Sequence, residues 1–209
     1  LGSTASIDTS GGWVNDRLET ANGRDAIAPI FITGGAVNLQ SSGNLTLAAG
    51  SVIDTSGGAR LGPTGALTGG KGGSIALGVN YREPRTLALN GTLQSDSVTQ
   101  GGTLNLNGPA FAIATATGNK LPVNIGDAIL LEPAFFADRG FSGYSLTATH
   151  GGIEVAPGTE LALRATNLVL DPQHYNYRPS GSSLRDFATR ALLPDYQRAG
   201  VSLSLLNRR

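Results

Sequence analysis

The sequence predicts an all-β fold, a right-handed parallel β-helix with three short strands per coil. Two observations lead to this prediction: one hexapeptide occurs twice, and short apolar stretches recur at a nearly constant spacing. The hexapeptide Ile-Asp-Thr-Ser-Gly-Gly occupies residues 7–12 and returns at 53–58, which is 46 residues later. Self-similarity at a fixed period is the sequence signature of architectures built by stacking.

Apolar residues mark strands of about four residues, separated by turns rich in Gly, Ser, Asn, Asp and Pro. One evenly spaced series consists of Val37, Leu45 and Ile53. A second series has nearly the same spacing and consists of Leu146, Ile153, Leu161 and Leu168. Three such steps predict a coil of roughly 22 to 24 residues, so that two coils account for the repeat of the hexapeptide.

The strands expected from this pattern alternate inward Leu, Ile or Val with outward Thr, Asn, Ser or Gln. They cover residues 36–39, 44–47, 51–53, 74–77, 86–89, 103–106, 145–147, 152–155, 160–163, 167–170 and 201–206. A β-sandwich has strands at similar spacing, but these are short for hairpin-paired sheets, and Asn-Gly turns are scarce. Each coil buries its apolar face only by stacking on the next, about 4.8 Å away.

Three regions depart from the repeat: residues 59–73, 129–144 and 171–200. Residues 59–73 are rich in Gly and contain Pro63, which predicts a flexible excursion from a corner. Residues 129–144 carry an aromatic cluster and predict a short helix after Pro133 that stops at Gly140. The cluster consists of Phe135, Phe136, Phe141 and Tyr144. A packed loop covering the flank is favoured here over a ligand site.

In the third region, Ser183 is placed to begin a helix, with Asp186 three residues later as a variant of the capping box. Apolar residues at helical spacing follow, namely Leu184, Phe187, Ala188, Ala191 and Leu192. Pro194 is expected to end or kink this helix. We expect it to pack on a sheet face or cap the core; the alternative is a helix that binds a partner.

We expect a single β-helix segment over residues 1–209, cut from a larger protein. The formal net charge is zero, and the two lysines, Lys71 and Lys120, lie far apart. Nucleic-acid affinity requires clustered basic residues, so no nucleic-acid partner is expected. No apolar run reaches the roughly 18 residues of a membrane-spanning helix, so no membrane insertion is expected either. Without cysteine there is no disulfide framework.

Candidate chemical motifs favour structural interpretations. Residues 65–72 nearly match a phosphate-binding loop, but Gly72 follows Lys71 where a hydroxyl is needed, and a strand rather than a helix is expected next. His150 and His174 are separated by about one predicted coil and lack a third ligand at zinc-like spacing. Asp8 and Asp54 occupy equivalent repeat positions, which favours Asx-turns at a corner over catalysis.

An enzyme remains an alternative, because β-helices also host polysaccharide lyases and hydrolases. Glycoside hydrolysis usually requires two carboxylates that face each other across the sugar. The 15 acidic residues are dispersed, and no expected strand carries an acidic pair on its outward face. The sequence therefore predicts no catalytic residue, no cofactor and no metal ligand.

Several segments of the chain carry a resemblance to a known family: the two Ile-Asp-Thr-Ser-Gly-Gly copies, residues 13–16 after the first copy, and residues 72–77, 135–142 and 191–196. On these segments the chain resembles the filamentous-haemagglutinin-like exoproteins of Gram-negative bacteria. The resemblance implies a two-partner secretion substrate, exported through an outer-membrane β-barrel transporter. It also implies a secreted or cell-surface location in a long β-helical rod for adhesion, biofilm formation or toxin delivery.

The favoured function is thus a structural or adhesive rod segment without catalysis, whose target would be a receptor or glycan on a host cell or bacterial surface. One alternative is a carbohydrate-active β-helix enzyme. Another is a scaffold that docks a partner protein through residues 171–200.

Overall fold

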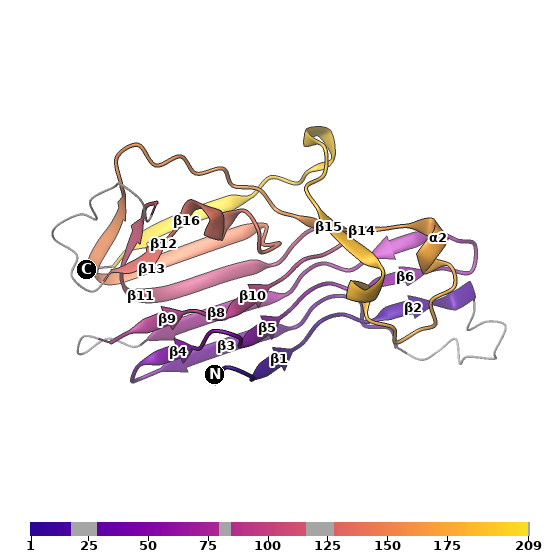
Figure 1. The fold of residues 1–209 in the computed structure, drawn as a ribbon, viewed down its shortest axis with the longest axis horizontal. Helices are drawn as coiled ribbons and strands as arrows, with labels where there is room; N and C mark the ends of the chain where they lie inside the picture. The colour runs from indigo at the N-terminus through magenta and orange to yellow at the C-terminus, as the bar shows by residue number, and fades with distance from the viewer. Residues whose placement is uncertain (18–28, 80–84, 116–127, 209) are drawn as a thin grey trace.

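A computed structural model describes residues 1–17, 29–79, 85–115 and 128–208 of the chain. Strands dominate this part of the chain, and most of them pair in parallel (Figure 1). The all-β prediction is therefore confirmed. No helix among the described residues is long and apolar enough to cross a membrane.

The elements are short, and most have three to six residues. The strands are β1 (Ser6–Asp8), β2 (Trp13–Asn15), β3 (Ala36–Ser41), β4 (Leu45–Leu47), β5 (Val52–Asp54), β6 (Ala59–Leu61), β7 (Leu67–Gly69), β8 (Ser74–Val79), β9 (Leu87–Leu89), β10 (Thr92–Gln94), β11 (Thr103–Ile113), β12 (Ile129–Leu131), β13 (Gly143–Val155), β14 (Asn167–Leu170), β15 (Ala188–Ala191) and β16 (Ser202–Asn207). The helical turns are η1 (Pro133–Phe136), α2 (Pro172–Tyr175), η2 (Leu184–Asp186) and η3 (Asp195–Gln197).

The chain returns repeatedly to the same sheets. Sheet A has the order β1-β5-β10, sheet B β2-β6-β7, sheet C β16-β13-β11-β8-β3 with β12 beside β11, and sheet D β4-β9. The chain passes through sheets A, B, C and D in this order twice, and strands of successive passes pair in parallel. In Figure 1 the passes lie above one another, from β1 at the bottom to β16 at the top.

The register of sheet A shows that the hexapeptide repeat spans one complete pass. Ile7 pairs directly with Ile53, and Ile53 pairs with Leu93. The prediction of two coils within each repeat is therefore wrong, because one repeat leads the chain back to sheet A only once. The even spacing of Val37, Leu45 and Ile53 does lead from sheet C through sheet D to sheet A, but the first two passes also include strands of sheet B.

The series from Leu146 to Leu168 has a different explanation. Leu146 and Ile153 both belong to the single long strand β13, so the step between them does not lead from one strand to another. Residues 159–166 form no strand, and Leu168 lies in β14, which pairs antiparallel with β15. The same spacing of apolar residues thus arises within one long strand and between successive short strands.

Apolar side chains point inward along the parallel strands and form the main core. In sheet C, Leu104 pairs with Ile75 on one side and with Tyr144 on the other. All three are buried, while the neighbouring Thr103 is exposed. Burying each Leu or Ile side chain contributes roughly 1.5–3 kcal/mol, which stabilises one pass against the next.

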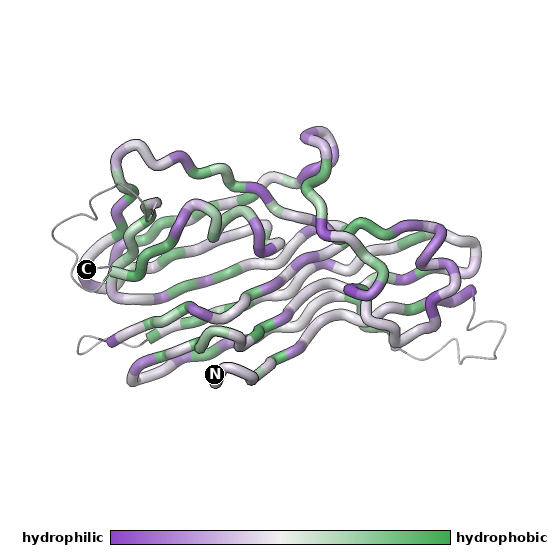
Figure 2. The backbone as a smooth tube through the Cα atoms, in the orientation of Figure 1, coloured by the Kyte–Doolittle hydropathy of each residue, from purple (hydrophilic) through white to green (hydrophobic). Residues whose placement is uncertain are grey.

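The repeated Gly-Gly pair, at residues 11–12 and 57–58, lies where backbone segments pack directly against each other. We call this region the waist. The Gly58 N–H donates to the Ile32 carbonyl at 2.6 Å, and the Gly73 N–H donates to the Thr55 carbonyl at 2.7 Å. A Cβ atom on Gly11 would lie 2.2 Å from the Ile32 oxygen. Only glycine permits this approach, and in Figure 2 the stretch that links the two groups of strands is correspondingly pale.

The waist separates the main core from a smaller second core around Trp13. The buried members of this second core are Trp13, Ala59, Leu61, Leu168, Leu184 and Phe187. The rings of Trp13 and Phe187 meet edge to face with centroids 5.2 Å apart. Residues 167–191 thus close the second core over sheet B, through contacts far apart in the sequence.

Two of the three predicted departures need correction. Residues 59–73 are not a flexible excursion, because β6 and β7 form an antiparallel hairpin in sheet B, and Leu61 is fully buried. The helix predicted from Ser183 is also wrong. Ser183 makes no side-chain cap, η2 spans one turn, and β15 then pairs with the edge of β14. The pairing partner, which is remote in sequence, overrides the helical spacing of the apolar residues.

The expectations for residues 129–144 are confirmed in part. The short helix after Pro133 is the 3-10 turn η1, but it ends at Phe136 and not at Gly140. Gly140 lies four residues further on and has a φ of +71°, which favours glycine. The aromatic side chains belong to the main core. Tyr144 contacts Phe136 with ring centroids 5.1 Å apart and Phe141 with centroids 5.7 Å apart.

Candidate functional site

Buried polar side chains follow strands β5 and β10 where they enter the waist, and we call this group the polar seam. Its members are Asp54, Thr55, Ser56, Ser95, Asp96 and Ser97. Backbone bonds continue the strand register through it: the Thr55 N–H donates to the Gln94 carbonyl at 2.9 Å, and the Gly57 N–H donates to the Asp96 carbonyl at 2.8 Å. The seam is therefore the stacked continuation of the sequence repeat.

The repeated aspartates cap the turn that leads into the seam. Asp8 Oδ1 accepts a hydrogen bond from the Ser10 N–H at 2.8 Å, and Asp54 Oδ1 accepts one from the Ser56 N–H at 2.9 Å. These are the Asx-turns predicted from the sequence, and the prediction is confirmed. A carboxylate that accepts a backbone N–H two residues later stabilises the corner locally.

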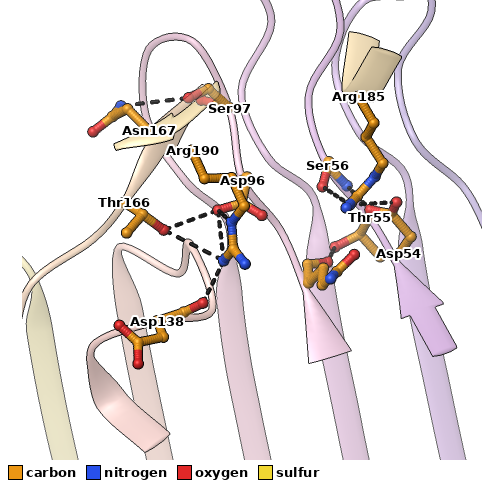
Figure 3. Close-up of polar contacts among 11 residues, drawn as sticks. Asp54, Thr55, Ser56, Asp96, Ser97, Asp138, Thr166, Asn167, Arg185 and Arg190 are labelled. Carbon is orange, nitrogen blue, oxygen red and sulfur yellow. Dashed lines mark hydrogen bonds and ion pairs between the residues drawn. The ribbon is translucent and has the colours of Figure 1, made fainter. Parts of the chain in front are cut away.

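The second oxygen of Asp54 binds a distant arginine. Asp54 Oδ2 lies 2.6 Å from Arg185 Nη2, and the same nitrogen donates to Ser56 Oγ at 3.2 Å (Figure 3). Arg185 comes from η2, so this ion pair fastens residues 184–186 onto the repeat. Because Asp54 is buried, the guanidinium compensates a charge that water reaches poorly.

Asp96 is the most enclosed charged group of the seam, with a side chain that is 0% exposed. Its Oδ1 accepts from Arg190 Nε at 3.1 Å and from Thr166 Oγ1 at 3.0 Å, as Figure 3 shows. Its Oδ2 is buried and has no hydrogen-bond partner among the described residues. Burial raises the pKa of Asp96 above its usual value, and Arg190 and Thr166 oppose this effect.

Arg190 joins three segments of the chain. Besides Asp96, its guanidinium donates to the carbonyl of Asp138 and contacts Thr166. Next to it, Asn167 Nδ2 donates to the Thr99 carbonyl at 2.9 Å. The two carboxylates of the seam, Asp54 and Asp96, thus each form an ion pair with an arginine from residues 184–190. These two ion pairs hold this segment across the waist.

A groove of about 750 Å3 lies beside the seam. It runs between residues 87–94 of strands β9 and β10 and the segment formed by β12 and η1. Arg139 lies at its rim with its guanidinium 4.5 Å from the centroid of the Phe135 ring. Burial lowers the pKa of Arg139 and raises the pKa of the nearby Tyr144 hydroxyl.

The structure places the other sequence candidates apart from this site. His150 lies in β13, whereas His174 lies in α2 and contacts Asp171 at 3.2 Å. The described residues contain no group of three His, Cys, Asp or Glu side chains placed to hold a metal ion. Strand β8 follows residues 65–72, so no helix N-terminus is present there to receive a phosphate.

Sequence reasoning missed Asp96, Arg185 and Arg190. One signal was available, since residues 93–97 are a degenerate third copy of the repeat, in which Asp96 replaces the serine of positions 10 and 56. In the other two copies this position carries a serine. A carboxylate in its place indicates that a specific side chain elsewhere in the chain pairs with it. Nothing in the sequence identifies that partner, because Arg190 is 94 residues away.

Comparisons of the chain with known proteins return no match to a family model, a curated protein or a solved structure.

Proposed function

We propose that this chain is a segment of a right-handed parallel β-helical rod and has a structural or adhesive role in a large bacterial exoprotein. The observation that carries the proposal is the in-register stacking of the repeat. Ile7, Ile53 and Leu93 form one column, and Asp8, Asp54 and Gln94 form the next. Each pass through the sheets adds one strand to each column, which is how solenoid proteins grow in one direction.

The glycine waist and the Asx-turns support a scaffolding role for the repeat. Both features stabilise the backbone conformation: Asp54 accepts a hydrogen bond from its own turn, and Gly11 and Gly58 permit close contact between backbone segments. The conspicuous sequence motif is therefore accounted for by stacking. The proposal accordingly assigns the repeat no catalytic role, no cofactor and no metal.

The sequence resemblance supports the cellular part of the proposal. It favours export through a two-partner-secretion transporter of the outer membrane and a secreted or cell-surface location. The target would be a receptor or glycan on a host or bacterial cell.

Electron microscopy of the protein together with its flanking sequence tests the rod. The expected particle is a thin rod whose length increases when further repeats are included, because each pass adds about 4.8 Å. A compact particle of unchanged length would contradict the proposal.

Incubation with alginate or polygalacturonate in the presence of Ca²⁺ tests the absence of catalysis, since any cleavage would contradict it.

Exposed aromatic residues favour docking of a partner protein as a second candidate function. Tyr177 is 79% exposed and Tyr196 is 85% exposed, both within residues 171–200. Exposed tyrosines are frequent anchors of interfaces. A Tyr177→Ala and Tyr196→Ala double variant should keep its stability and lose binding to cells or extracts that bind the parent chain. Unchanged binding would contradict this candidate.

A further inference from the structure

The first pass into the waist repeats the turn that binds an arginine in the second pass. Asp8 pairs in register with Asp54, so the turn at residues 8–10 stacks on the turn at residues 54–56, about 4.8 Å away. In both turns the aspartate Oδ1 accepts a hydrogen bond from the N–H of the serine two residues later. The two turns therefore have the same local geometry, and the group bound by the second indicates what the first can bind.

The second turn binds a guanidinium group through two acceptors. Arg185 Nη2 lies 2.6 Å from Asp54 Oδ2 and donates to Ser56 Oγ at 3.2 Å, as Figure 3 shows. The Asx-turn leaves Oδ2 available for this contact, because Oδ1 is the oxygen that accepts the backbone N–H. Charge-assisted hydrogen bonds of this kind are roughly twice as strong as neutral ones. The turn thus presents a carboxylate oxygen and a hydroxyl side by side to one guanidinium group.

The third pass also binds an arginine at this level of the seam. Gln94 is in register with Asp54, and Asp96 follows at the position that carries a serine in the first two passes. The Asp96 carboxylate accepts the Arg190 N–H. Two successive passes thus each receive an arginine from residues 184–190.

The first turn has the same acceptors but no cation. Asp8 Oδ2 and Ser10 Oγ correspond to the two atoms that bind Arg185 in the second turn. Both side chains are exposed, and no ion pair among the described residues includes Asp8. A carboxylate that already has one oxygen fixed by its turn is preorganised for a cation at the other oxygen.

A cavity of about 320 Å3 gives access to this carboxylate. It is lined by residues of both turns and by residues 181–185. Its volume lies at the lower end of the roughly 300–1,000 Å3 typical of ligand sites, which suits one side chain of a partner. Arg185 in the lining is bound by Asp54, so Asp8 leaves the cavity with an excess negative charge.

We propose that the turn of Asp8 and Ser10 binds an arginine side chain of a partner protein, in the way that the turn stacked on it binds Arg185. The guanidinium enters the cavity and donates to Asp8 Oδ2 and Ser10 Oγ. Its several N–H donors in a fixed planar arrangement match two adjacent acceptors better than an ammonium group does. The site requires only the stacked turns, and it depends neither on the adhesive role nor on the exposed tyrosines.

N-acetyl-arginine amide provides the probe, titrated at constant ionic strength into the isotope-labelled whole chain. The NMR signal of the Ser10 N–H, which donates to Asp8, should shift and saturate with a Kd of about 10 mM, the order expected for one charge-assisted contact. The lysine analogue should bind at least about threefold more weakly. The citrulline analogue has the same shape without the charge and should not saturate.

Variants of the chain test the two acceptors. Asp8→Asn keeps an oxygen for the Ser10 N–H and removes the charge, so the turn should persist while arginine binding weakens at least about fivefold. Ser10→Ala should reduce the preference for the arginine probe over the lysine probe. Glu160→Gln, an exposed carboxylate outside the cavity, should leave the affinity unchanged.

Three results would overturn the proposal: no saturation of the Ser10 shift up to about 100 mM probe; equal affinity for the arginine and citrulline probes; or unchanged affinity in folded Asp8→Asn. Equal affinity for the arginine and lysine probes would refute the preference for a guanidinium group. If Asp8→Asn does not fold, the comparison of the arginine and citrulline probes on the parent chain decides the question.

Discussion

Two nitrogens of Arg190, Nε and Nη2, both lie 3.1 Å from Oδ1 of Asp96, although 94 residues separate the two in the sequence. The carboxylate is completely buried, whereas the arginine side chain is 37% exposed. This pair joins the third pass through the waist to β15. A change of charge at either residue is therefore expected to affect the stability of the fold.

Replacement of Arg190 by Gln should destabilise the chain by about 2 kcal/mol or more. The change leaves a buried carboxylate without its cation, which costs roughly 3–5 kcal/mol for fully buried pairs and less here, because Arg190 is partly exposed. Urea denaturation followed by circular dichroism measures the change. Arg164→Gln, an exposed arginine outside the seam, should shift the free energy of unfolding by less than about 0.5 kcal/mol.

The pH dependence of stability should report the raised pKa of Asp96. Because the folded state holds the Asp96 proton more tightly than the unfolded state, its contribution to stability decreases as pH rises from the usual value of 3.8 through the raised pKa. Urea titrations between pH 4 and pH 8 measure it as the difference between the parent chain and Asp96→Asn. That difference should shift in favour of Asp96→Asn as pH rises, and a flat or opposite trend would contradict the prediction.

The two glycines of the first repeat should respond differently to alanine. A Cβ on Gly11 would lie 2.2 Å from the Ile32 oxygen, whereas the closest atom to a Cβ on Gly12 lies 3.7 Å away. Gly11→Ala should therefore destabilise by about 3 kcal/mol or more, and Gly12→Ala by less than about 1 kcal/mol. Thermal melting of the two variants provides the comparison. Equal losses would show that the waist does not require close backbone contact.

Trp13, the single tryptophan, provides a fluorescent probe of the second core. Its side chain is buried against Phe187, and its Nε1 donates to the Arg178 carbonyl at 3.1 Å. Phe187→Ala should shift the Trp13 emission to longer wavelength and destabilise by about 3–5 kcal/mol, because the ring loses its packing partner. Exposed Tyr177→Ala should leave both the emission and the stability unchanged.

Local sequence patterns predicted the strands better than they predicted their pairing. The expected strand at 167–170 coincides with β14, and strands also occur where 36–39, 74–77 and 103–106 were expected. The alternation of inward and outward residues is a property of a single strand. It carries no information on whether the partner of Ile53 lies half a repeat or a full repeat away, and the structure pairs Ile53 with Ile7, a full repeat away.

The segment after residue 171 shows the same limit more strongly. Leu184, Phe187 and Ala188 have helical spacing, yet η2 ends after one turn and Ala188 enters β15. Two distant partners stabilise the strand conformation of β15. Its backbone pairs with the free edge of β14, and its Arg190 side chain forms an ion pair with Asp96. Neither partner is visible in a local pattern.

The sequence by itself determined the all-β class, the inward apolar residues and the Asx-turns of Asp8 and Asp54, because these depend on contacts within a few residues. Only the tertiary structure decided the length of each pass, the glycine waist, the ion pairs of Asp54 and Asp96, and the groove along β10. These depend on which distant segments meet. Strand pairing and charge pairing between residues far apart in the chain follow from how the whole chain buries its apolar surface.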